Sequence, residues 1–150
     1  MPKRRLPVLQ NANEGSDEPP RPAWQWVGFG ALAIVAVWVP LSALAGAVAA
    51  SLLAHMPDER ALGRAAILTA TAYLVELAAG AFAGGYLIGK WGPAGVGVRQ
   101  AALAGLTAAA ALGVGTWASF GPTIGMALVA FMAPLTAALG GKVGARRRVL

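Results

Sequence analysis

The sequence predicts an all-α integral membrane protein, a bundle of four transmembrane helices with both termini in the cytoplasm. Of its 150 residues, 57% are hydrophobic and only 12% are charged, whereas soluble domains carry about 25% charged residues. Four segments approach or exceed the length of about 20 apolar residues that a membrane-spanning helix needs. The cations gather in the two tails and in one loop. These three observations predict both the fold class and the orientation.

Residues 1–22 are predicted to form a disordered cytoplasmic tail. They are polar and contain five prolines, so they cannot bury enough apolar surface to become ordered. The prolines are Pro2, Pro7, Pro19, Pro20 and Pro22. A four-helix transmembrane domain is expected over residues 23–142, and a short basic cytoplasmic tail over residues 143–150.

The first span, about 24–54, is longer than a bilayer requires. Pro40 lies near its middle and removes a backbone donor, so we expect a kink there. Trp38 would pack beside this kink, and the alternative is that its ring stacks on a ligand. Ala47-Val48-Ala49 is similar to a signal-peptidase site, but the apolar run before it far exceeds the roughly 7–15 residues of a signal peptide.

The second span, about 65–89, follows a loop at Pro57-Asp58-Glu59-Arg60, in which Asp58 is well placed to cap the helix. Trp91-Gly92-Pro93 then breaks the chain.

The third span, about 98–118, and the fourth, about 122–141, are joined by the tight turn at residues 119–122. So short a connection makes these two helices antiparallel neighbours. Pro134 is expected to kink the fourth span.

The distribution of cations predicts the orientation. Ten of the 12 Lys and Arg residues lie in the tails or in the loop after the second span: Lys3, Arg4, Arg5, Arg21, Lys90, Arg99, Lys142, Arg146, Arg147 and Arg148. Arg60 and Arg64 lie in the first loop. Because Lys and Arg are enriched in cytoplasmic loops, both termini are predicted to be cytoplasmic. We expect a multi-pass protein of a bacterial-type inner membrane.

Glu76 is the most informative residue, because it is the sole acidic residue inside the four apolar segments. An ionisable side chain at that depth costs about 2.5–3.5 kcal/mol on insertion scales, so it is normally paired, protonated or functional. The spans contain no Lys, Arg or His near it. We therefore expect a neutral carboxyl group rather than a salt bridge.

Two interpretations of Glu76 stay open. Thr69, Tyr73, Glu76, Gly80 and Gly84 recur at spacings of three or four residues and so share one helix face. Tyr73 or Thr107 could hydrogen-bond the carboxyl group, which would then hold helices together. Alternatively, Glu76 is a proton-coupling site in a transporter, with these residues around it.

Glycines and alanines at every fourth position predict close helix packing. Small residues allow helix backbones to approach each other. The glycines concerned are Gly80, Gly84, Gly85, Gly89, Gly105, Gly113, Gly121 and Gly125. A groove that no intramolecular helix fills would become a dimer interface.

Two short internal similarities compete. Pro40-Leu41-Ser42-Ala43 is similar to Pro134-Leu135-Thr136-Ala137, which relates spans of opposite direction, as in an inverted repeat. Ala83-Gly84-Gly85 is similar to Leu139-Gly140-Gly141, which relates spans of the same direction, as in a duplicated hairpin. Both arrangements occur in transporters.

Several chemistries are disfavoured by composition. The chain has no Cys and one His, so thiolate chemistry and metal binding are not expected. Gly84-x4-Gly89-Lys90 lacks the Ser or Thr and the preceding strand of a phosphate loop. We expect no enzyme activity, cofactor, metal or nucleic-acid partner.

The predicted function is that of a small inner-membrane protein that packs as an oligomer or as a subunit of a larger membrane complex. The alternative is a proton-linked transporter of a small solute or ion, working through Glu76 as a dimer.

Overall fold

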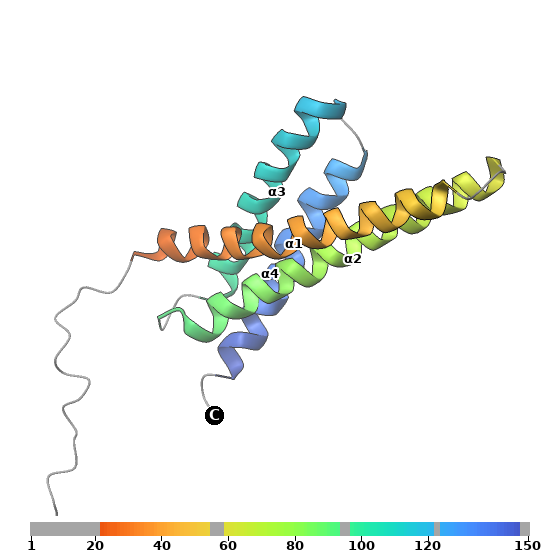
Figure 1. Ribbon diagram of the computed structural model, residues 1–150. Helices are drawn as coiled ribbons and strands as arrows, with labels where there is room; N and C mark the ends of the chain where they lie inside the picture. The colour runs from red at the N-terminus through yellow and green to blue at the C-terminus, as the bar shows by residue number, and fades with distance from the viewer. Residues whose placement is uncertain (1–21, 55–58, 94–96, 122–123, 148–150) are drawn as a thin grey trace, which may run out of the picture.

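The computed structural model describes residues 22–54, 59–93, 97–121 and 124–147, and these residues form four α-helices. The helices are α1 (Ala23–Leu53), α2 (Glu59–Trp91), α3 (Val98–Phe120) and α4 (Ile124–Arg146). Each is long and apolar enough to cross a membrane. The predicted all-helical fold with four candidate membrane spans is therefore confirmed (Figure 1).

Two helices extend beyond the apolar segments that predict them. Helix α2 begins at Glu59 rather than near residue 65, and α4 continues to Arg146 rather than ending near residue 141. Hydropathy locates the part of a helix that suits hydrocarbon, but Glu, Lys and Arg are themselves good helix formers. The helices therefore continue into their polar ends. The expected N-terminal tail, residues 1–21, and the expected cap Asp58 lie outside the described residues.

Local backbone contacts define both ends of α3. At its start, the Gly97 N–H donates to Gln100 Oε1 over 3.1 Å, so a side chain satisfies one of the free donors of the first turn. At its end, Gly121 has a φ of 72° and its N–H donates to Trp117 O over 2.9 Å. Glycine adopts this left-handed conformation without steric cost, so it terminates the helix here.

Both intrahelical prolines lie within continuous helices, Pro40 in α1 and Pro134 in α4. Each removes one helical hydrogen bond. The bends expected at these positions remain predictions.

Helices α2 and α4 run in the same direction and meet through glycines. The position that a Cβ would take on Gly85 is filled by Ala137 O, and the corresponding position on Gly140 is filled by Phe82 O. One turn further along, Gly89 meets Gly141 O and Gly144 meets Tyr86 O. A methyl group at any of these four glycines would collide with the backbone of the other helix. This is the closest kind of helix contact, and small residues are required for it.

The contacts between α2 and α4 are reciprocal. Gly85 of α2 contacts Ala137 of α4, and Gly140 of α4 contacts Phe82 of α2. Adding 55 to the residue numbers of α2 gives the equivalent residues of α4, because Gly85 then corresponds to Gly140 and Phe82 to Ala137. The same offset relates Gly89 to Gly144. Each helix thus presents equivalent residues to the other, as in a two-fold symmetric interface. The offset of 55 is one residue shorter than that of the short sequence match, so the contact does not pair the residues of that match, and both repeat relationships stay predictions.

Buried residues are confined to one half of the bundle. Within the described residues of the helices, they fall in Gly30–Ile34 of α1, Leu77–Gly89 of α2, Ala101–Ala109 of α3 and Ala133–Gly144 of α4. We call this part, which holds the start of α1 and the end of α4, the closed half. The remaining parts, residues 35–53, 62–76, 110–118 and 124–132, contain no buried residue, and we call them the open half.

The helices diverge in the open half as two arms, α1 with α2 and α3 with α4 (Figure 1). The change of residue size explains this divergence. Where α2 and α4 touch, the contact residues are glycines, whereas Leu74 of α2 and Leu128 and Val129 of α4 line a cavity further out. Larger side chains hold helix axes further apart, and glycine contacts favour crossing rather than parallel helices.

Candidate functional site

Glu76 lies at the boundary between the two halves. It is the last residue of the open half of α2, and Leu77, which follows it, is 1% exposed. The Glu76 side chain as a whole is half-buried, but its Oε2 atom is buried and has no hydrogen-bond partner. Trp26 Nε1 in the closed half is also buried without a partner. An unpartnered polar atom is costly in an apolar environment.

The polar groups expected to bind Glu76 have other partners. Thr69 Oγ1 donates to Ala65 O over 2.8 Å, and Thr107 Oγ1 donates to Leu103 O over 2.8 Å. Thr107 is also exposed. The Tyr73 hydroxyl lies against Gly46 of α1, 2.9 Å from the position that a Cβ would take there. The expected hydrogen bond to the carboxyl group is therefore absent at Oε2.

The rest of the polar face of α2 packs on α1. A Cβ on Gly80 would lie 3.5 Å from Ile34 O, and one on Gly84 would lie 2.6 Å from Ile34 Cγ1. The stripe that contains Glu76 thus faces α1, whereas Gly85 and Gly89 face α4. Because residues 84 and 85 differ by about 100° around the helix, one helix can pack against two neighbours through adjacent glycines.

The other predicted packing glycines fall into two groups. Gly105 of α3 lies against α4, where a Cβ would be 2.5 Å from Ala133 O. Gly113 has only Met126 Cε nearby, at 3.7 Å, and Gly125 is exposed. Gly121 ends α3 and has no side-chain neighbour within 4 Å of a Cβ. The tight contacts thus belong to the closed half, and Gly113 and Gly125 line the open half.

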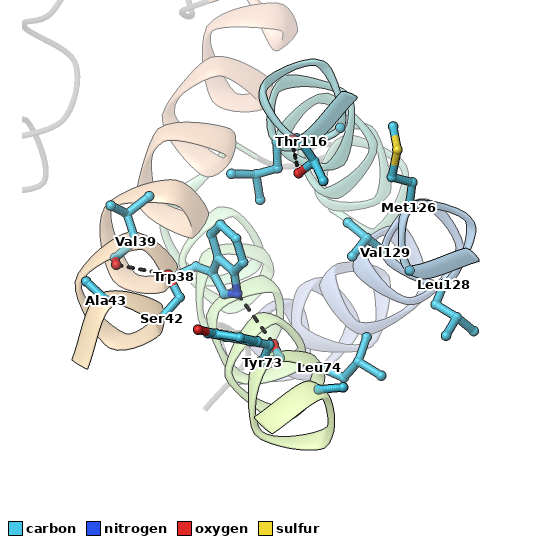
Figure 2. Close-up of a pocket in the computed structure, with 14 residues that line it drawn as sticks. Trp38, Val39, Ser42, Ala43, Tyr73, Leu74, Thr116, Met126, Leu128 and Val129 are labelled. Atoms are coloured by element: carbon cyan, nitrogen blue, oxygen red, sulfur yellow. Dashed lines mark hydrogen bonds between the residues drawn. The ribbon is translucent and has the colours of Figure 1, made fainter. Parts of the chain in front are cut away.

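A cavity of about 770 Å³ separates the two arms of the open half, and all four helices line it (Figure 2). Trp38 and Ser42 come from α1, Tyr73 from α2, Thr116 from α3 and Met126 from α4. A second cavity, of about 720 Å³, lies along α3 and α4 and is lined by Trp117 and Val114, among others. Glu76 lines neither of these two cavities.

Trp38 lies beside the turn of α2 that carries Glu76. Its Nε1 donates to Tyr73 O over 3.4 Å, and its Cβ lies 3.9 Å from the position of a Cβ on Gly80. The two α2 residues that Trp38 contacts, Tyr73 and Gly80, lie three residues before and four residues after Glu76. The Trp38 ring also forms part of the cavity wall (Figure 2). Trp38 therefore packs between helices, as its packing interpretation predicts, and borders the cavity as well.

Gly140, Gly144 and the cavity itself were not predicted as features of a site. The repeated Gly-x3-Gly spacing at residues 140–144 is a signal that sequence reasoning could have used. The cavity leaves no such signal, because it depends on how far two hairpins diverge.

The described residues contain no cluster of His, Cys, Asp or Glu that could hold a metal ion. Comparisons of the chain with protein-family models, with curated proteins and with solved structures found no match. Its function must therefore be argued from its own geometry.

Proposed function

We propose that this chain is a non-enzymatic, multi-pass membrane protein that acts by packing in the bilayer, with further copies of itself or as a subunit of a larger membrane complex. The observation that carries this proposal is the absence of a polar route in the described part of the spans. Seven hydroxyl side chains each donate to a carbonyl three or four residues earlier in the same helix: those of Ser42, Ser51, Thr69, Thr71, Thr107, Thr116 and Thr136.

These internal hydrogen bonds have a functional consequence. A hydroxyl that donates within its own helix has no proton left to donate to a polar solute. The spans then present mainly apolar surface, including Leu32, Ile67 and Phe131, each at least 65% exposed. Apolar surface of this kind suits lipid or another membrane helix.

The mass of native-membrane nanodiscs that contain the protein tests this proposal. Nanodiscs excised from the native membrane with a polymer, without detergent, would be weighed by mass photometry after capture through a C-terminal tag. We expect discs that hold more than one 15.1-kDa chain, or one chain with another subunit. Discs that hold one copy and no other protein, at native expression level, would contradict it.

The proposed orientation places both termini in the cytoplasm of a bacterial-type cell. The exposed residues Lys90, Arg99, Lys142, Arg146 and Arg147 lie at the closed end, and the positive-inside rule favours the cytoplasm for that end. A tag at either terminus should resist protease in intact spheroplasts. Cleavage of the N-terminal tag would reverse the orientation. Replacement of Lys90 and Arg99 with Gln should not, because both tails keep their cations.

The second candidate function is proton-linked transport through Glu76. The buried, unpartnered Oε2 atom at the boundary of the open half favours it, because membrane-buried acids commonly serve proton relays. In proteoliposomes, Glu76→Gln should abolish uptake driven by a pH gradient, since an amide cannot release a proton, whereas Glu76→Asp should shift its pH profile. Undiminished transport in Glu76→Gln would exclude this candidate.

A further inference from the structure

The cavity of about 770 Å³ between the two arms has an apolar wall with no charged group. Its main lining residues include Trp38, Tyr73, Leu74, Leu112, Thr116 and Met126. Its volume lies within the range of about 300–1,000 Å³ that is typical of small-molecule sites. The cavity is therefore large enough for a ligand and offers it hydrocarbon contacts.

Three of the four polar side chains of this wall donate hydrogen bonds to protein carbonyls, and the hydroxyl of the fourth, Tyr73, lies against Gly46 of α1. Trp38 Nε1 donates to Tyr73 O over 3.4 Å, Ser42 Oγ to Val39 O over 3.0 Å, and Thr116 Oγ1 to Leu112 O over 2.8 Å. Figure 2 shows the first two of these bonds within the helices and side chains that surround the cavity. A polar ligand would gain little here, and water would find few partners. The wall therefore suits a ligand that is mainly apolar.

The segments of this chain outside the described residues are either short or highly charged. The undescribed connections 55–58, 94–96 and 122–123 span four residues or fewer. Helix α1 begins and α4 ends in the closed half, at the opposite end from the cavity. Residues 1–21 also carry seven charged side chains, which are costly to place in hydrocarbon.

A helix of a second copy is too wide for the cavity. A helix with its side chains is about 10–12 Å across, so 770 Å³ would hold only about 8 Å of its length, between one and two turns. A transmembrane contact of that length is too short to align two spans. A flexible hydrocarbon chain is narrower and can follow the wall.

We propose that this cavity binds an acyl chain of a bilayer lipid, which enters between the α1–α2 arm and the α3–α4 arm. The lipid tail then occupies the space that side chains occupy in the closed half. It contacts all four helices and holds the two arms at their observed separation. The headgroup stays outside the cavity, whose wall offers it no charged partner.

Photolabelling of the full chain in lipid nanodiscs tests this inference. The probe is a phosphatidylcholine with a diazirine on one acyl chain, and the labelled peptides are mapped by mass spectrometry. We expect labelling of the cavity segments 38–43, 70–74, 112–116 and 125–129 to exceed that of the lipid-facing residues Leu135 and Leu139 by several-fold. Uniform labelling of all exposed residues would overturn the proposal.

Substitutions that fill the cavity provide the matched comparison. Ala70→Phe places a ring in the cavity, whereas Ala66→Phe alters an exposed position of the same helix one turn away that lines neither cavity. Ala70→Phe should lower labelling of segments 112–116 and 125–129 several-fold, and Ala66→Phe should leave it unchanged. Ala43→Phe repeats the test from α1 if Ala70→Phe does not fold. Equal labelling in all variants would contradict the proposal.

The number of copies in each disc separates a lipid from a second chain. If a second copy filled the cavity, these segments would be labelled in one-copy discs and protected in two-copy discs, which would overturn the proposal. If an acyl chain fills it, labelling is the same in both. This result is independent of the assembly that we propose as the function.

Discussion

The closed and open halves of this bundle are made from the same four helices but pack by different means. In the closed half, glycines of α2 meet carbonyl oxygens of α4, and Ile34, Leu77 and Ile88 are at most 2% exposed. In the open half, no described residue is buried, and a cavity lies between the arms. Both halves are apolar. Because two equally apolar halves differ in how closely their helices pack, apolar composition alone does not hold these helices together.

The bilayer explains why the fit of the surfaces matters more than their polarity. Lipid tails are as apolar as leucine, so moving a leucine from lipid to protein gains little hydrophobic free energy. Stability must come from close van der Waals contact, which requires surfaces that match. Reciprocal Gly-x3-Gly segments provide such surfaces in the closed half. The open half lacks them and therefore leaves room for other molecules.

The largest expected effect comes from adding bulk to the glycine contact. Gly85→Leu should destabilise the bundle by about 3 kcal/mol or more, because the carbonyl of Ala137 cannot move without displacing α4. Gly125→Leu, in the open half, should change stability by less than about 0.5 kcal/mol, because its side chain enters the cavity. Thermal unfolding in bicelles measures both. Equal losses would show that the two halves are packed alike.

A smaller effect is expected from removing bulk. Leu77→Ala should cost about 2 kcal/mol through the cavity that it leaves in the closed half. Leu74→Ala is the matched control, because Leu74 lies one turn away on α2 and already borders the open cavity. Its loss should be below about 1 kcal/mol. Reversible unfolding by a denaturing detergent gives both values, and a Leu74 loss that equals the Leu77 loss would contradict the division.

The smallest effect is expected at the boundary. Glu76→Gln preserves shape and hydrogen-bonding capacity, and Oε2 has no partner to lose. The variant should therefore fold with a stability equal to or slightly above that of the wild type. Thermal unfolding of both proteins in the same bicelles tests this. A large loss of stability would show that a charged carboxylate is held by a specific partner.

Much of the fold could be predicted because its determinants are local. Apolar runs of about 20 residues or more, separated by Pro57, by Gly92-Pro93 and by Gly121-Pro122, are sufficient to place four helices. The short turn after α3 also predicts its antiparallel contact with α4, which Gly105 and Ala133 make. Only the polar ends of α2 and α4 extend further than the hydropathy suggests.

The site was harder to predict because its determinants are not local. The spacing of Gly85, Gly89 and Gly125 is that of a packing ladder in each case, yet only the first two meet another backbone. The spacing of the glycines does not show which neighbouring helix packs against them. Likewise, Thr107 lies near the middle of α3, but the rotation of the helix leaves it exposed and bonded to Leu103. The position of Glu76 inside a long apolar helix was predictable, but its place between the closed and open halves was not.

The division into two halves is tested most directly by the access of dissolved oxygen to alanine methyl groups. Oxygen concentrates in hydrocarbon, and its paramagnetism broadens the NMR signals of the methyl groups it reaches. In bicelles, the methyl signals of Ala101, Ala104, Ala133 and Ala137, each 0% exposed, should stay narrow. Those of Ala43, Ala70, Ala110 and Ala127, in the open half, should broaden. Equal protection of the two sets would show that the open half is packed as tightly as the closed half.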